Sequence, residues 1–167
     1  MLYLLRHLLS VLVLPTTMVV VIPVWIARRY GVVMRWPADA VAWVSVAAGA
    51  LALAAGLMLF AASLRMFFTV GRGTLAPWDP PRHLVVHGPY RYVRNPMISG
   101  VVFVLLGIAL VLRSQPHALW AAAFLGLNLV FFLLIEEPML EAKFGDAYRT
   151  YKRNVRRFLP RLRAWNG

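Results

Sequence analysis

Four long apolar stretches without a charged side chain limit what this chain can fold into. They cover residues 8–27, 41–64, 97–112 and 114–135, and an arginine or a glutamate follows each one at once. A helix needs about 20 apolar residues to cross roughly 30 Å of hydrocarbon. Of the 167 residues, 61% are hydrophobic and 14% are charged, whereas soluble domains are about half apolar and about a quarter charged. The sequence therefore predicts an all-α integral membrane protein with about four transmembrane helices, folded as a single domain over residues 1–167.

The basic residues predict how these helices are oriented. The chain holds 18 Lys and Arg against 6 Asp and Glu, a formal net charge of +12. Basic residues cluster in the stretch 65–96 and again after residue 135. Four spans place both clusters on the same side of the membrane. The positive-inside rule predicts that this side is the cytoplasmic one. We therefore expect both termini to be cytoplasmic, although Arg28, Arg29 and Arg35 then fall on the outer side. No nucleic-acid-binding motif accompanies the charge, so the predicted partner is the anionic membrane surface.

Small residues predict where helices approach each other closely. Such residues recur on one face of the second span and on the third span, and they are Ser45, Gly49, Ala52, Gly56, Gly100 and Gly107. Small side chains at this spacing let two membrane helices pack backbone to backbone. Pro15 and Pro23 predict a kink in the first span. That span lacks the cleavage site of a signal peptide, so we expect it to be retained.

The tail after the fourth span predicts an amphipathic helix over residues 136–160. Its apolar residues recur at helical spacing, and they are Leu140, Phe144, Ala147, Tyr148, Tyr151 and Val155. A helix of this kind lies on the membrane surface or docks on the helical bundle. We expect Gly145 to end one helical segment and Asp146 to cap the next.

Two polar features are candidates for a ligand site. Glu136 and Glu137 end the fourth span, where both the helix dipole and the membrane boundary disfavour a carboxylate. Either they pair with Arg94 or Arg153, or one of them holds a cationic ligand group, and the residues alone leave both possibilities open. The second feature is the run 87–96, which two prolines stiffen, and it is either a preorganised site or a rigid turn before the third span. The chain has no cysteine and its histidines lack metal-ligand spacing, so no metal site is predicted.

Taken in order, these residues resemble the isoprenylcysteine carboxyl methyltransferase family and the related phospholipid methyltransferases. The resemblance covers residues 87–160 and rests on an ordered series of short motifs. The motifs are His87-Gly88-Pro89-Tyr90, Arg94-Asn95-Pro96, Gly100, Glu136-Glu137, Phe144-Gly145-Asp146-Ala147-Tyr148-Arg149-Thr150-Tyr151 and Phe158-Leu159-Pro160. The first two spans match only in being apolar.

The resemblance implies an integral membrane enzyme that transfers a methyl group from S-adenosylmethionine to a lipophilic acceptor. Its cofactor site would face the cytoplasm, between the loop 65–96, the last two spans and the segment 136–160. The cofactor-binding residues that it implies are His87, Gly88, Pro89, Tyr90, Arg94, Asn95, Pro96, Glu136, Glu137 and Tyr148. The residues that it places nearest the reacting groups are Glu137, Arg153 and Asn154.

Two departures from the family pattern concern the acceptor. Asn95 stands where the family often has histidine, and Asn154 stands where members acting on prenylcysteine carboxylates tend to have arginine. An isoprenylcysteine-like carboxylate, a phospholipid amine and another small lipophilic nucleophile therefore all stay open as acceptors. The alternatives to methyl transfer are an NADPH-dependent sterol-type reductase, for which the chain is short, and a non-catalytic membrane protein with the same fold.

Overall fold

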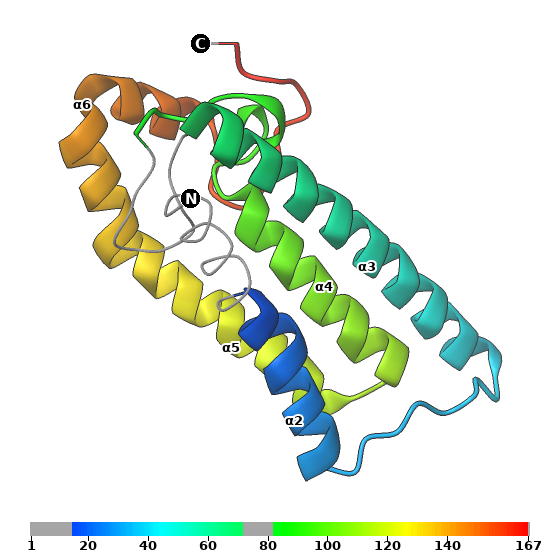
Figure 1. Ribbon diagram of the computed structural model, residues 1–167. Helices are drawn as coiled ribbons and strands as arrows, with labels where there is room; N and C mark the ends of the chain where they lie inside the picture. Colours follow the sequence, from blue (N-terminus) through cyan, green and yellow to red (C-terminus); the bar gives the residue numbers. More distant parts are fainter. Residues whose placement is uncertain (1–14, 72–81, 167) are drawn as a thin grey trace. The chain divides into compact units, whose positions relative to one another are not determined.

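A computed structural model describes residues 15–71 and 82–166, and within these ranges the chain is all helical with no strand. The helices are α2 (Ile22–Arg29), α3 (Ala40–Met66), α4 (Pro96–Leu112), α5 (Gln115–Phe131) and α6 (Glu137–Asn154), drawn in Figure 1. Short helical turns adjoin or separate them, and these are η1 (Thr17–Val21), η2 (Phe67–Gly71), η3 (Gly88–Arg91) and η4 (Phe132–Glu136). The predicted all-α class is confirmed.

Two continuous helical runs are long and apolar enough to cross a membrane. One is Ala40–Gly71, formed by α3 and η2, and the other is Gln115–Asn154, formed by α5, η4 and α6. Helix α4 is apolar but shorter. The predicted spans 41–64, 97–112 and 114–135 fall on these helices. Residues 8–14 of the first predicted span lie outside the described residues, so a four-span topology stays a prediction.

The chain divides into two compact units, each described by itself. Unit 1 comprises Met1–Met58 and Gly100–Leu125, and unit 2 comprises Leu59–Ser99 and Gly126–Gly167.

In unit 1, glycines bring the backbones of α3 and α4 into contact. A Cβ atom added at Gly49 would lie 2.9 Å from the carbonyl oxygen of Gly107, and one added at Gly56 would lie 2.7 Å from that of Gly100. Real Cβ atoms do not approach backbone this closely, so only glycine fits. The Ser45 hydroxyl adds a hydrogen bond of 2.9 Å to the Leu110 carbonyl. The predicted use of these small residues for close helix packing is confirmed, and the structure shows that α3 and α4 are each other's partners.

Also in unit 1, side chains of α5 complete the hydrogen bonding that a proline leaves open. Residues 17–21 form a π turn, in which each carbonyl accepts from the N–H five residues later. The carbonyl of Met18 would therefore need an N–H at Pro23, which has none. The indole of Trp120 donates to it instead, at 3.1 Å. His117, which is buried, lies 3.1 Å from the Pro23 carbonyl through Nε2 and 2.7 Å from the Ser114 hydroxyl through Nδ1.

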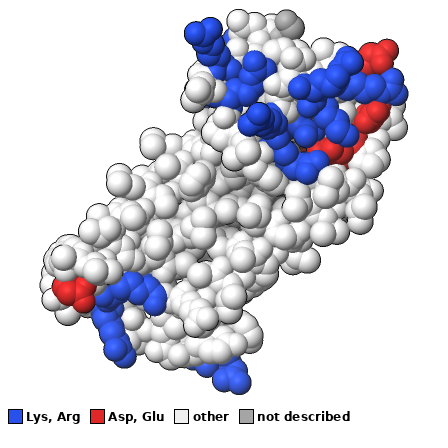
Figure 2. Space-filling model, turned by 180° about the vertical axis from the view of Figure 1, so that it is seen from behind, with Lys and Arg blue, Asp and Glu red and all other residues white. Residues whose placement is uncertain are grey.

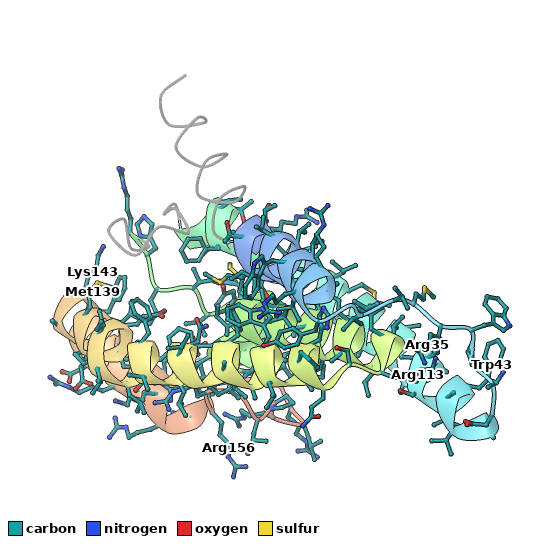
Figure 3. The ribbon with its side chains drawn as sticks, turned by 90° about the horizontal axis from the view of Figure 1, so that it is seen from below. Arg35, Trp43, Arg113, Met139, Lys143 and Arg156 are labelled. Atoms are coloured by element: carbon teal, nitrogen blue, oxygen red, sulfur yellow. The ribbon has the colours of Figure 1, made fainter. Side chains whose placement is uncertain are left out.

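The turn between α4 and α5 is as short as the sequence predicts. Helix α4 ends at Leu112 and α5 begins at Gln115. Arg113 adopts a positive φ of 49°, and its guanidinium donates to the Arg35 carbonyl at 2.9 Å. Figure 3 labels these two residues next to each other.

In unit 2, the apolar side of α6 forms a small core. Tyr148, Tyr151 and Val155 are buried and pack against partly buried residues, which are Leu84, Val86, Leu140, Phe144 and Trp165. Gly145 (φ 55°, ψ −130°) divides α6 into two segments, as predicted, because this conformation is accessible almost only to glycine. The carboxylate of Asp146 accepts a hydrogen bond from the Arg149 guanidinium at 2.7 Å.

Candidate functional site

The loop 87–96 and the tail segment 155–166 are joined along their backbones. The tail leaves α6 at Val155 in an extended conformation and then follows the loop. Four backbone N–H groups donate to backbone carbonyls across this junction. The bonds run from Arg94 to Arg156 (2.9 Å), from Asn95 to Arg157 (3.2 Å), from Arg161 to Tyr92 (2.9 Å) and from Trp165 to Arg91 (3.0 Å). These bonds hold the polar residues of the loop beside those of the tail.

Glu137 lies at the centre of three cations. Its Oε1 accepts from Arg94 Nη1 at 2.8 Å and from Arg157 Nη2 at 2.6 Å, and its Oε2 lies 3.1 Å from Lys152 Nζ. The side chains of Glu137 and Arg94 are only 7% and 9% exposed. Of the two predicted partners, Arg94 is therefore the correct one. Arg153 is exposed and donates to the Thr150 hydroxyl at 3.3 Å instead.

The sequence did not predict that Lys152 and Arg157 bind Glu137. Lys152 lies fifteen residues after Glu137, close to four helical turns, so a straight helix would place both on roughly the same side. The division at Gly145 removes the basis for that expectation. Arg157 follows the end of α6, where no periodicity predicts a position.

Unlike Glu137, Glu136 has no cationic partner among the described residues. It is half-buried, and no hydrogen bond or ion pair joins its carboxylate to another residue within 15–71 and 82–166. Burial, followed by the nearby negative charge of Glu136, raises the pKa of the Tyr90 phenol above its ordinary value. Tyr90 is therefore a neutral phenol close enough to Glu136 to sense its charge.

Arg94 retains one unused donor at a buried position. Its Nη1 also donates to the Tyr148 hydroxyl at 3.3 Å, which is how the structure brings Tyr148 to the site. Its Nε is buried and has no hydrogen-bond acceptor among the described residues. A buried donor left unpaired costs about 1–3 kcal/mol, so this position favours an added acceptor.

A cavity of about 650 Å³ lies beside the loop in unit 2. His87 lines it, together with residues that were not predicted as site residues: Leu84, Val86, Arg91, Asp146, Ala147, Thr150, Trp165 and Asn166. Trp165 is fixed there because its N–H donates to the Arg91 carbonyl at 3.0 Å and its carbonyl accepts from Arg91 Nε at 2.9 Å. Ala147 lies on this cavity wall rather than in the core of α6.

The remaining predicted residues shape the loop and the tail. Gly88 has a positive φ of 55°, and a Cβ there would lie 3.1 Å from the side chain of Met66. Pro89 lies in η3, Pro96 begins α4, and the Asn95 carbonyl accepts from the Ser99 hydroxyl at 2.9 Å.

Asn154 is placed differently from the other predicted residues. It is exposed, and its side-chain amide donates to the Thr150 carbonyl at 2.9 Å. Neither Arg153 nor Asn154 bonds to Glu137 in the part of the chain that the structure describes.

This polar cluster sits on helices of a known class of membrane enzyme. The chain belongs to the phospholipid methyltransferase family, whose family model matches residues 44–147. The match runs from α3 to the kink of α6 and includes the loop and both glutamates, so the resemblance drawn from the sequence is confirmed. The family is one of methyltransferases, and the two long apolar helices agree with a membrane protein. No curated protein and no solved structure matches the chain.

Proposed function

We propose that this chain transfers a methyl group from S-adenosylmethionine to a lipophilic acceptor at the membrane boundary. The observation that carries the proposal is the family match over 44–147, which contains the Glu136–Glu137 pair and most of the loop-side site. The proposal includes four transmembrane helices in one domain, with the site on the cytoplasmic side, as the distribution of basic residues predicts.

The residues present fit the charges of this cofactor, which carries a sulfonium, an ammonium and a carboxylate. Glu137 is already neutralised by three cations, so Glu136 is the carboxylate that is free to receive a cationic group. Arg94 Nε is free to donate to a carboxylate. The cavity beside His87 has a volume in the range of about 300–1,000 Å³ that small-molecule sites occupy, although neither Glu136 nor Arg94 lines it.

The chain's own residues would act by binding and alignment. The bound cofactor supplies an electrophilic methyl group that needs no metal or redox partner. Glu136 and Arg94 would fix its charged end. Holding donor and acceptor in line in a dry site accounts for a large share of the acceleration in such reactions.

Among the open acceptors, we favour an amine headgroup of a phospholipid. An acceptor carboxylate would call for a cation beside the reacting groups, but Arg153 and Asn154 are exposed on α6 and bond to Thr150. The family's description as phospholipid methyltransferases agrees with an amine acceptor.

Binding to the purified protein in detergent tests the cofactor. We expect saturable binding of S-adenosylmethionine and none of NADPH, measured by calorimetry. Glu136→Gln should weaken the binding at least tenfold. The matched control is Glu141→Gln, which changes a carboxylate on the same helical run that is paired with exposed Arg149. Binding of NADPH alone would support a reductase, and binding of neither would support a non-catalytic protein.

Transfer of labelled methyl groups into a lipid extract tests the acceptor. We expect label in a phospholipid fraction, in an acid-stable and base-stable N-methyl group. Label in a base-labile methyl ester would show that the acceptor is a carboxylate.

A further inference from the structure

Unit 2 carries a positive charge that its own carboxylates do not neutralise. Its described residues include twelve Lys and Arg against four Asp and Glu. Figure 2 shows the acidic side chains gathered among basic ones at α6. Glu137, Glu141 and Asp146 pair with four of these cations, which are Arg94, Arg149, Lys152 and Arg157. The other eight cations have no carboxylate partner among the described residues.

Part of this unpaired charge lies on the tail segment, interspersed with exposed leucines. Arg156 and Arg163 are exposed, and between them Leu159 is 65% exposed and Leu162 is fully exposed. Figure 3 shows the side chain of Arg156 pointing away from the ribbon. We call Arg156, Leu159, Leu162 and Arg163 the tail surface.

The tail surface is held in place rather than left to fold on contact. Three of the four backbone hydrogen bonds that join tail and loop lie within its span, at Arg156, Arg157 and Arg161, and the fourth follows it at Trp165. Phe158, between the arginine and the first leucine, turns inward and its ring lies 6.0 Å from that of Phe132. Ordering the backbone beforehand lowers the entropic cost of binding for the side chains that point outward.

We propose that the tail surface binds anionic lipid headgroups, with both arginines on the phosphates and both leucines inserted at the acyl boundary. Exposed aliphatic side chains between unpaired arginines are the signature of a segment that lies in the membrane interface. A nucleic acid would instead engage basic residues with exposed aromatic rings for base stacking, and Phe158 and Trp165 are both turned inward in aromatic pairs. The side chains of this surface are not among those proposed to hold the cofactor, so the inference does not depend on that function.

The absence of cysteine from the sequence makes a direct test possible. In the full chain, Leu162→Cys would be labelled with a polarity-sensitive fluorophore and placed in nanodiscs of phosphatidylcholine with increasing phosphatidylglycerol. We expect the emission to shift to the blue and brominated acyl chains to quench it as phosphatidylglycerol increases. Added salt should reverse both effects because it screens exposed charges.

Two substitutions that each remove one positive charge distinguish binding by the tail surface from a general effect of the protein's net charge. Arg156→Gln removes an unpaired charge. Each basic residue near an anionic surface contributes about 1 kcal/mol, so this variant should weaken the dependence on phosphatidylglycerol about fivefold. Arg149→Gln removes an exposed arginine that is already paired with Glu141 and Asp146, and should leave that dependence unchanged.

Three results would overturn the proposal. The first is a label that stays in a polar environment at every lipid composition. The second is an equal loss in both arginine variants, and the third is a larger response to RNA than to phosphatidylglycerol.

Discussion

Replacing Glu137 with glutamine should destabilise the protein far more than the same replacement at the nearby Glu141. Glu137 is the shared acceptor of Arg94, Arg157 and Lys152, and removing its charge leaves all three without that anion. Removing one partner of a buried ion pair costs about 3–5 kcal/mol. Lys152 is 40% exposed and Arg157 19% exposed, so water compensates them in part. We therefore expect the lower end, about 3 kcal/mol.

This loss should be visible in thermal unfolding in detergent, followed by the fluorescence of the six tryptophans. In a chain of this size, each 1 kcal/mol shifts Tm by about 2–4 °C, so Glu137→Gln should lower Tm by roughly 10 °C. The matched control is Glu141→Gln, whose partners Arg149 and Lys152 are 55% and 40% exposed. Exposed pairs contribute about 1 kcal/mol or less, so its Tm should fall by about 3 °C at most.

Measuring the unfolding of both variants at low and high salt tests the same reasoning independently. High salt should reduce the effect of Glu141→Gln and leave most of the effect of Glu137→Gln, because buried pairs are screened little. If both variants unfold within about 2 °C of each other, the buried three-cation cluster does not stabilise the fold and the reasoning fails.

Three further substitutions test the helix contacts. Gly107→Leu should lower Tm strongly because a Cβ there would lie 2.8 Å from a backbone oxygen, whereas Gly126→Ala, with open space at its Cβ, should hold or raise Tm. Gly145→Ala should cost about 1–3 kcal/mol through backbone strain, and near-wild-type unfolding would show that α6 can straighten without loss. Trp120→Phe should cost about 1 kcal/mol by leaving the Met18 carbonyl without its donor, as chemical denaturation would measure; an unchanged midpoint would show that the carbonyl finds another donor.

Hydropathy predicted the positions of the helices but not where they end. The uncharged stretch 41–64 predicted α3, yet the helical run continues past Arg65 to Gly71. The stretch 114–135 predicted α5, yet the run continues through both glutamates into α6. Pro138 does not stop it because it stands in the first turn of α6, where a proline needs no N–H partner. In these two runs, neither the charged residues nor the proline marks the point where the helix ends.

The site was also predicted only in part. The residues alone left open whether the glutamates pair with Arg94, pair with Arg153 or hold a cationic ligand group, and the pair of Glu137 with Arg94 is present at 2.8 Å. The part played by Arg157 depends on the direction of the chain after Val155, whose extended conformation no spacing in the sequence encodes. The cavity wall formed by Trp165 likewise depends on hydrogen bonds between segments more than seventy residues apart.

The glycine contacts between α3 and α4 also bear on how an acceptor could reach any site in this protein. Where the Gly49 and Gly107 backbones touch, a methyl group does not fit between the two helices, and an acyl chain is wider than a methyl group. Opening that seam would break the contacts at both Gly49 and Gly56 at once. This seam is therefore closed to a long acyl chain, and the long-chain acceptor that we propose would have to enter between helices that meet through larger, movable side chains.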